Sequence, residues 1–446
     1  MDRSVVAVLF GTFTLRFSTG LTGAMLVYYL NDLPDHGGVE VTAVVVGVFT
    51  ALFYATELVA SPIFGLLSDR LGHYRVMQHG PLFGAVAVVI TGLTTDLVLL
   101  GGTRVLEGAA TAASIPSILG FIAMATADDQ ALRGRVAARF ELATIAGLGG
   151  GFAAAGLFWS LLGPAAFYLN AVFYIGSLAI YRYGVVPPRA ARRGLDGAAA
   201  RELGDPHRPE FGWRRYGRLL RSSHVWLLAP TWIAVNAALG LYTSQTLFAL
   251  VREPVPRFAD QLLMGGFSPL EVTAGFVVAG VVFFAGIIYW GDRFKKYRRT
   301  TIIFYGILGG AVLVAGAVAL NHSRDVEPLL RVPMALLAGA GLFVLAGATP
   351  AALGLLADIS EVYPDDRGAI MGLYGVFLAI GQIGGSLIGG FAAEEFGFDG
   401  ILVATLVLML VALPPLAQLR LFEHRFEPTP GGQQPPPEQP SDHDNS

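Results

Sequence analysis

The chain has 446 residues, of which 54% are hydrophobic and only 14% are charged, and its mean hydropathy is +0.59. This composition excludes an ordinary soluble protein, and the net charge of -3 argues against nucleic acid as a partner. The sequence contains no cysteine, which excludes disulfides, thiolate metal sites and cysteine nucleophiles. We therefore expect a protein that crosses the lipid bilayer many times and uses no metal and no cofactor.

Twelve apolar segments of the chain reach the length, roughly 20 residues, that a helix needs to cross a bilayer. In chain order we expect these spans at about residues 4–30, 43–66, 76–95, 98–123, 137–160, 164–186, 224–249, 270–291, 300–320, 329–357, 367–391 and 398–421. The first segment begins like a signal peptide, but it is too long and lacks a small-residue cleavage site at the expected length. We interpret it as a retained first helix.

The distribution of Lys and Arg predicts the orientation of these spans. With twelve spans, nearly all bases outside them fall on the side of the N-terminus, and the opposite side carries only Arg252, Arg257, Arg324 and Arg331. Because cytoplasmic loops carry an excess of Lys and Arg, both chain ends are predicted to be cytoplasmic. We expect a multi-pass protein of the plasma (inner) membrane.

The spans fall into two halves. Residues 187–223 are basic, rich in Gly and Pro, and contain no apolar run of membrane length. We expect a six-helix bundle over residues 1–186, a cytoplasmic linker over 187–223, a second six-helix bundle over 224–422 and a disordered cytoplasmic tail over 423–446.

A charged loop after the second predicted span is repeated in the second half. The loop reads GLLSDRLGHYR from Gly65 to Arg75, and its second copy reads GDRFKKYR from Gly291 to Arg298. Aligning Asp69 with Asp292 also aligns two arginines and a tyrosine. At an offset of 234 positions, further glycines of the two halves match, which indicates an internal duplication. The matched pairs are Gly147 with Gly381, Gly150 with Gly384, and Gly151 with Gly385.

The first copy resembles the G-x-x-x-D-R-x-G-x-x-R loop of major facilitator superfamily transporters, and the resemblance covers about residues 4–422. The second copy has lost both glycines, because Ile288 and Lys295 stand at their positions. The resemblance implies an all-α fold of 12 transmembrane helices in two pseudo-symmetric six-helix bundles, with a substrate site between them near the bilayer midplane. Drug/proton antiporters are the members it resembles most.

The resemblance also implies that the loop acts as a conformational latch. In the family, Asp69 would face the start of the eleventh span, and the arginines would meet acids at the end of the fourth. Such contacts would form in the outward-facing state only. The other reading of the loop is a basic anchor that sets topology alone. The residues assigned to the latch are Gly65, Asp69, Arg70, Gly72, Arg75, Asp128, Asp292 and Arg293.

Four charges lie deep within predicted spans of the first half: Arg16, Glu57, Arg104 and Glu107. Arg16 and Glu57 each lie about 12 residues, roughly 18 Å, from the cytoplasmic end of their helix, so they can pair. Arg104 and Glu107 share a face of one helix and, with Gly108, match a family motif, R-x-x-[QE]-G, that is linked to proton coupling. Desolvation favours the neutral form of a carboxyl group, so such a carboxylate can exchange a proton near neutral pH. The alternative reading is a structural lattice of ion pairs.

The second half has no charge deep in a predicted span. Its candidates for the substrate cavity are the polar and aromatic residues Asn236, Tyr242, Gln245, Tyr289, Trp290, Tyr374 and Gln382. Each of them could equally be a packing residue. An apolar and aromatic wall opposite proton-exchanging groups suits an amphipathic or hydrophobic substrate.

Glycines give the fifth and eleventh predicted spans a nearly bare face. We expect Gly147, Gly151, Gly156, Gly381 and Gly385 to pack against other helices, either statically or as a sliding surface. The first three fit an exporter motif of the family, G-x-x-x-G-P-x-x-G-G. Phe152 replaces its proline and Ala155 one of its glycines, which weakens the case for export.

The sequence thus predicts a secondary transporter that works by alternating access, most simply as a monomer that exports a small amphipathic molecule in exchange for protons. Proton-coupled uptake of a small organic anion is the first alternative, with the two buried arginines as its anion ligands. A non-transporting membrane sensor or assembly protein with the same fold is the second. An enzyme is not expected, because the sequence has no Ser–His–Asp set, no metal-spaced histidines and no phosphate-binding loop.

Overall fold

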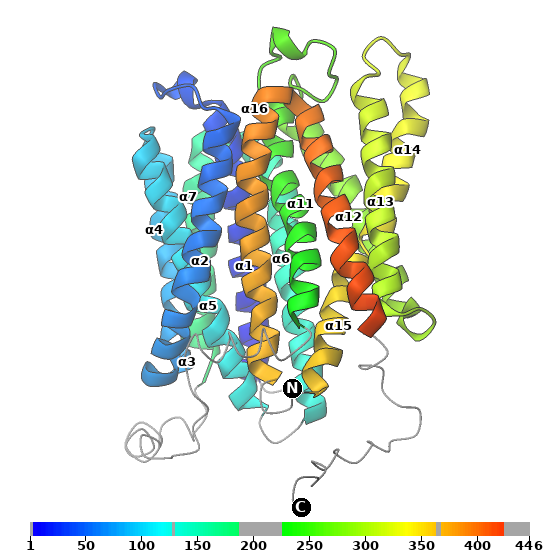
Figure 1. The fold of residues 1–446 in the computed structure, drawn as a ribbon. Helices are drawn as coiled ribbons and strands as arrows, with labels where there is room; N and C mark the ends of the chain where they lie inside the picture. The colour runs from blue at the N-terminus through cyan, green and yellow to red at the C-terminus, as the bar shows by residue number, and fades with distance from the viewer. Residues whose placement is uncertain (1–2, 127–129, 187–224, 363–366, 423–446) are drawn as a thin grey trace, which may run out of the picture.

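The computed structural model describes residues 3–126, 130–186, 225–362 and 367–422. Every regular element in these four ranges is a helix. The long helices run roughly side by side along the height of the molecule (Figure 1). The first half contains α1 (Arg3–Asn31), α2 (Ala43–Leu71), α3 (His73–Val76), α4 (His79–Leu93), α5 (Leu97–Ala125), α6 (Gln130–Leu162), α7 (Ala166–Ala179) and a π-helical turn, Ile180–Gly184.

The second half has the same kind of architecture. It contains α11 (Val225–Val251), α12 (Pro269–Gly291), α13 (Arg299–Asn321), α14 (Pro328–Leu345), α15 (Ala348–Val362) and α16 (Arg367–Phe422). Short 3₁₀ turns at Leu33–His36, Gly163–Ala165, Pro256–Phe258 and Asp292–Lys295 connect long helices. α1 begins and α16 ends at the same end of the molecule, at the bottom of Figure 1. We call this end the terminal side and the opposite end the far side.

Ten stretches of the described residues are long and apolar enough to cross a membrane. Two of them, of 46 and 47 residues, would be about 70 Å long as straight helices, which is more than twice the thickness of a bilayer core. Each is interrupted at a glycine of positive φ: Gly163 (φ 52) between α6 and α7, and Gly397 (φ 63, ψ -143) within α16. Only glycine adopts such angles without a steric penalty. Twelve spans would require each of these two stretches to cross the membrane twice, so the number of twelve stays a prediction.

Capping residues determine where three helices begin on the far side. Thr42 accepts a hydrogen bond from the N–H of Val45 at the start of α2, and Asp96 accepts one from Leu99 at the start of α5. α12 begins with a complete capping box between Ser268 and Glu271. Each cap satisfies a backbone donor that the first helical turn leaves free.

The buried apolar side chains form two clusters, and their locations reveal how the halves meet. The first cluster contains most of the buried apolar residues of the first half. It also contains far-side residues of the second half, such as Leu241, Phe258, Val272 and Phe398. The buried residues of the second cluster, which include Trp232, all lie in α11, α13, α15 and α16. Within the described residues, the halves thus share a core on the far side and have separate cores on the terminal side.

Direct contacts between the halves are also found on the far side. The hydroxyl of Tyr28 in α1 donates to the carbonyl of Pro269 in α12 over 3.4 Å. The rings of Phe152 in α6 and Phe276 in α12 meet edge to face, with centroids 4.9 Å apart. These contacts close the far side of the interface.

Candidate functional site

A buried ion pair in α5 is the most strongly charged feature of the first half. The Nη1 atom of Arg104 donates to Oε2 of Glu107 over 2.6 Å, and the two residues are only 6% and 2% exposed. The guanidinium also lies 5.1 Å from the ring centroid of Phe53 in α2. The second carboxylate oxygen of Glu107, Oε1, is buried and has no hydrogen-bond partner among the described residues. An unpartnered buried carboxylate oxygen is costly, so this atom is a natural place for a proton.

A second group of charges lies beside this pair. Arg16 of α1 interacts electrostatically with Glu57 of α2 and with Glu141 of α6. Tyr54 lies within electrostatic range of Arg16, Glu57 and Arg104, and so links the two groups. The Nε atom of Arg16 is buried and has no hydrogen-bond partner among the residues that the structure describes. The structure therefore brings the four predicted intramembrane charges into one region of the first half.

Glycines explain why these helices approach so closely. A Cβ atom on Gly108, the residue after Glu107, would lie 2.4 Å from the carbonyl oxygen of Phe53. A Cβ atom on Gly147 of α6 would lie 2.5 Å from the carbonyl oxygen of Phe13 and 2.9 Å from Cβ of Arg16. Larger residues would push α5 from α2 and α6 from α1. The glycines thus hold the charged turns of the helices side by side.

Tyr54 and Glu141 also belong to this region, although their sequence context does not point to the cavity. Tyr54 follows an aromatic residue in an apolar helix, where a tyrosine is commonly a packing residue. Glu141 lies near Arg135 and Arg139 in the sequence, so a local ion pair explains it equally well. The spacing of Tyr54, three residues before Glu57 on the same helical face, was the available signal.

The polar candidates of the second half lie on α11 and α16. Asn236 and Gln245 are buried, and the side-chain amide of Asn236 donates to the carbonyl of Trp232 in its own helix. Gln382 is 6% exposed, and its Oε1 accepts from the hydroxyl of Thr243 over 3.5 Å.

Two further candidates stand apart from these. Tyr242 is half-buried, with Thr405 as its polar neighbour. The side chain of Tyr374 lies outside the described residues. Among the described residues, α11 and α16 therefore present amide and hydroxyl groups without a deep charge.

Gln245 connects the two halves. Its Nε2 atom donates over 3.2 Å to the carbonyl of Ala43, in the first turn of α2. A Cβ atom on Gly47, one turn later, would lie 2.3 Å from the carbonyl of Ser386 in α16. Gln245 is therefore part of the far-side closure and lies away from the charged region of the first half.

The latch residues of the first loop can be described, whereas their predicted partners, Asp128 and the side chains at the start of α16, lie outside the described residues. Asp69 and Arg70 are exposed at the terminal end of α2, and Gly72 (φ 94) ends the helix. Oδ1 of Asp69 lies 3.9 Å from Nε2 of His73. Arg75 is exposed as well.

The other latch residues that the structure describes are Gly65, Asp292 and Arg293. A Cβ atom on Gly65 would lie 3.8 Å from Pro116 of α5. Asp292 is exposed, and the guanidinium of Arg293 lies 4.5 Å from the ring centroid of Tyr289. Asp128 and residues 363–366 lie outside the described residues.

The packing glycines make two kinds of contact. Gly147 and Gly151 pack on α1 within the first half, and Gly381 and Gly385 pack on α11 within the second. Gly156, in contrast, packs on the other half: its Cβ atom would lie 2.3 Å from the carbonyl of Pro269. The exporter-like glycine motif therefore ends at a contact between the halves.

Comparison with known proteins identifies the architecture. The family model described as Major Facilitator Superfamily matches residues 8–358 and again residues 263–442. Quinolone resistance protein NorA of Staphylococcus aureus (strain COL) is 22% identical over 436 residues, which cover 94% of this chain and 99% of that protein. Multidrug resistance protein 2 of Bacillus subtilis (strain 168) is 23% identical over 348 residues, which cover 77% of this chain and 78% of that protein.

Solved structures of transporters share the fold at low sequence identity. The nucleoside transporter NupG superposes with a TM-score of 0.67 at 14% identity and covers 96% of this chain and 100% of its own. A peptide transporter, POT, in complex with sulfate superposes with a TM-score of 0.69 at 16% identity and covers 96% of both chains.

Proposed function

The chain belongs to the major facilitator superfamily of membrane transporters, and from this premise we propose that it exports a small amphipathic or hydrophobic molecule in exchange for protons. Two of its curated relatives are named for resistance to quinolones and to multiple drugs, which supports the direction and the substrate class. The observation that carries the proton coupling is the buried Arg104–Glu107 pair, in which Oε1 of Glu107 has no hydrogen-bond partner in the described part of the chain. Among the described residues, the buried polar groups of α11 and α16 near Asn236 and Gln382 are amides and hydroxyls, which supports an uncharged or amphipathic cargo.

The proposed cycle follows from the arrangement of the charges. Arg104 holds Glu107 as a carboxylate, and a proton that arrives at Oε1 removes the charge and weakens this ion pair. Arg104 is then free to turn toward Glu57 or Tyr54, because all three lie in one electrostatic network. A change in the pairing of α5 with α2 moves the helix that carries the far-side closure. Protonation is thereby linked to the side on which the cavity opens.

We assign this structure to the state that is open on the terminal side, since the described residues of the two halves share a core on the far side and form separate cores on the terminal side. The terminal side is proposed to be cytoplasmic and the membrane to be the plasma membrane, because the basic loops gather there. Twelve crossings follow if the two long stretches each cross twice, at Gly163 and Gly397. The proposed unit of transport is the monomer, with a six-helix bundle on either side of the linker at 187–223.

Uptake of a small organic anion is the second candidate. Within the described ranges, the buried Nε atom of Arg16 has no hydrogen-bond partner, and it could donate to a carboxylate or phosphate of the cargo. This reading predicts that the anion and protons move in the same direction.

Transport in inverted membrane vesicles distinguishes the candidates. The vesicles are energised by an inside-acid proton gradient, and the movement of a fluorescent quinolone-type compound and of protons is recorded together. Export predicts that the compound accumulates inside while protons leave the vesicles. Co-movement of an organic anion with protons in the same direction would replace the export proposal by uptake. If no compound in a panel of cations, zwitterions and anions moves protons, proton-coupled transport is rejected.

A further inference from the structure

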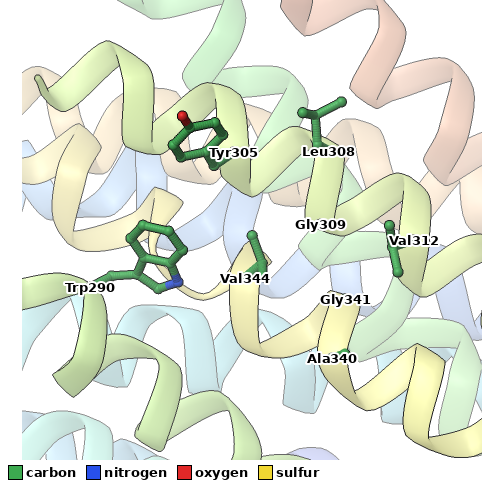
Figure 2. A pocket seen from close by; sticks show the side chains of 8 residues that line it. All are labelled: Trp290, Tyr305, Leu308, Gly309, Val312, Ala340, Gly341 and Val344. Atoms are coloured by element: carbon green, nitrogen blue, oxygen red, sulfur yellow. The ribbon is translucent and has the colours of Figure 1, made fainter. Parts of the chain in front are cut away.

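A lateral groove in the second half is unrelated to the charged region of the first half. It lies between the terminal-side parts of α12, α13 and α14 and has a volume of about 330 Å³ (Figure 2). Its lining consists of Trp290, Tyr305, Leu308, Gly309, Val312, Ala340, Gly341 and Val344. Every one of these side chains is apolar or aromatic, so the groove suits a hydrocarbon chain and offers little to a polar ligand.

Close packing of α13 on α14 forms the floor of the groove. A Cβ atom on Gly309 would lie 2.7 Å from the N atom of Leu345, and one on Gly341 would lie 2.2 Å from the N atom of Leu313. The floor therefore lacks side chains, while Tyr305 and other side chains of the groove rise beside it (Figure 2). Tyr305 is 37% exposed, which places the groove on the outside of the bundle, where lipid lies.

The depth of the groove corresponds to one leaflet of a bilayer. It extends along α13 to Val312, which is 13 residues from the start of this helix at Arg299 on the terminal side. Thirteen residues of helix rise about 20 Å, and half of a bilayer core is about 15 Å thick. The groove therefore reaches from the membrane surface to about the bilayer centre, the depth that one acyl chain occupies.

Two series of aromatic contacts connect the mouth of the groove to cations. The ring of Trp290 lies 5.4 Å from that of Tyr289, over which Arg293 is placed at 4.5 Å. On the other side of the mouth, Tyr305 lies 6.3 Å from Tyr297, and Nζ of Lys296 lies 5.6 Å from the centroid of Tyr297. The mouth thus has aromatic rings at the level of the headgroups and positive charge just outside it.

The loop that carries these cations is strongly basic. Residues 292–299 contain five bases and one acid, Asp292. This loop is the second copy of the charged motif, in which Lys295 stands where the first copy has Gly72. The loss of the motif glycine and the gain of bases indicate a role other than the latch predicted for the first copy.

We propose that the groove and the loop together bind one anionic phospholipid, with an acyl chain along Gly309 and Gly341 and the phosphate against Arg293 and Lys296. An anionic lipid fits better than a zwitterionic one, because the loop has an excess of positive charge and polybasic segments attract anionic headgroups. A shaped groove next to this charge fixes one lipid in place, whereas a flat basic surface would only enrich the lipids around it.

Quenching of tryptophan fluorescence by brominated lipids tests the proposal on the full-length protein in detergent. The contribution of Trp290 is the difference between the protein and its Trp290→Phe variant. Phosphatidylglycerol with a brominated acyl chain should quench this contribution saturably, and at lower concentration than brominated phosphatidylcholine. Arg293→Gln and Lys296→Gln should each raise the half-saturating concentration of phosphatidylglycerol about fivefold.

Two substitutions on α14 separate the acyl-chain site from the charge. Ala340→Phe fills the groove and should abolish saturable quenching by both lipids. Leu336→Phe is its control, because Leu336 is 68% exposed on the same helix and does not line the groove. Arg420→Gln removes an exposed base elsewhere on the terminal side and should leave the lipid affinity unchanged.

Three results would overturn the proposal. Equal quenching by the two lipids would show that the loop does not select the headgroup. Unchanged saturation in Ala340→Phe, with a normal elution profile, would show that no chain lies in the groove. Displacement of the lipid by glycerol phosphate at equal concentration would show an anion site that does not require the acyl chain.

Discussion

The carboxylate of Glu394 accepts a hydrogen bond from the backbone N–H of Ala43 over 2.9 Å and so joins α16 to the first turn of α2. The carbonyl of Ala43 accepts the amide of Gln245 at the same place. Both bonds cross between the two halves on the far side. A carboxylate at a helix N-terminus gains from the free N–H groups and from the helix dipole. Glu394 therefore stabilises the conformation seen here and loses its partner when the far side opens.

Replacing Glu394 should shift the conformational equilibrium toward the state that is open on the far side. We expect Glu394→Ala to cost the closed state about 1 kcal/mol, a shift of about fivefold. Because the sequence has no cysteine, the label can be placed at one position, Ser386→Cys, which is buried at the interface. An impermeant maleimide should react faster with Ser386→Cys when Glu394 is replaced.

The neighbouring acid provides the control for this experiment. Glu395 is exposed and pairs with Arg257 of the same half, at 3.4 Å. Glu395→Gln should leave the labelling rate of Ser386→Cys unchanged. An equal acceleration by both substitutions would show that charge in general, and not the bond to Ala43, controls closure.

Neutralising the buried pair of α5 separates proton coupling from structural pairing. Glu107→Gln should reduce substrate-driven proton movement by tenfold or more, because the amide cannot exchange a proton. It should also lower the unfolding temperature, since Arg104 is left buried without its counter-charge. The double variant Arg104→Gln/Glu107→Gln should recover stability while remaining uncoupled. If the double variant recovers coupled transport as well, the pair is a structural lattice only.

Two glycines of α6 should respond differently to enlargement. A Cβ atom on Gly151 would lie 2.0 Å from the carbonyl of Phe17 in the same half, so Gly151→Val should lower stability in every conformation. Gly156 packs on Pro269 of the other half, so Gly156→Val should mainly disfavour far-side closure. We expect a loss of 1–3 kcal/mol for the first substitution, as in other overpacked sites, and faster labelling of Ser386→Cys for the second. Equal effects on melting and labelling would contradict this distinction.

The latch prediction implies a change in the labelling rate of Ser386→Cys opposite to that expected for Glu394→Ala. If Asp69 binds the start of the eleventh predicted span only when the terminal side is closed, Asp69→Asn should destabilise that state by about 0.3–1 kcal/mol. The population closed on the far side would then grow two- to fivefold, and Ser386→Cys would react more slowly. Faster labelling, as expected for Glu394→Ala, would exclude the latch role.

The sequence was informative about the fold because the bilayer constrains every span to one physical solution. A helix is the only structure that satisfies each backbone group within an apolar run, so length and hydropathy predict the spans. The breaks at Gly163 and Gly397 lie between predicted spans. Which way a span faces is less evident, because the lipid side and the protein side are both apolar. For this reason Trp290 was assigned to the cavity as a candidate, whereas it lines the lateral groove.

Site residues that carry a charge inside a span could be predicted from the sequence. Residues whose role depends on a contact with another helix could be predicted less well. Arg16, Glu57, Arg104 and Glu107 could be assigned from the cost of an ion in lipid. The role of Glu394 could not, because an acid near the end of an apolar run looks like any interfacial residue. Only the three-dimensional arrangement places its carboxylate on a helix of the other half. The conformational state is likewise a property of the packed molecule.

The second buried cluster, made of residues from α11, α13, α15 and α16 alone, has a consequence for how the molecule can be assembled. On the terminal side, each half contains a packed core of its own. Two fragments divided within residues 187–223 and produced in the same cell should therefore fold separately. They would then associate through the far-side surface into an active complex without a continuous chain.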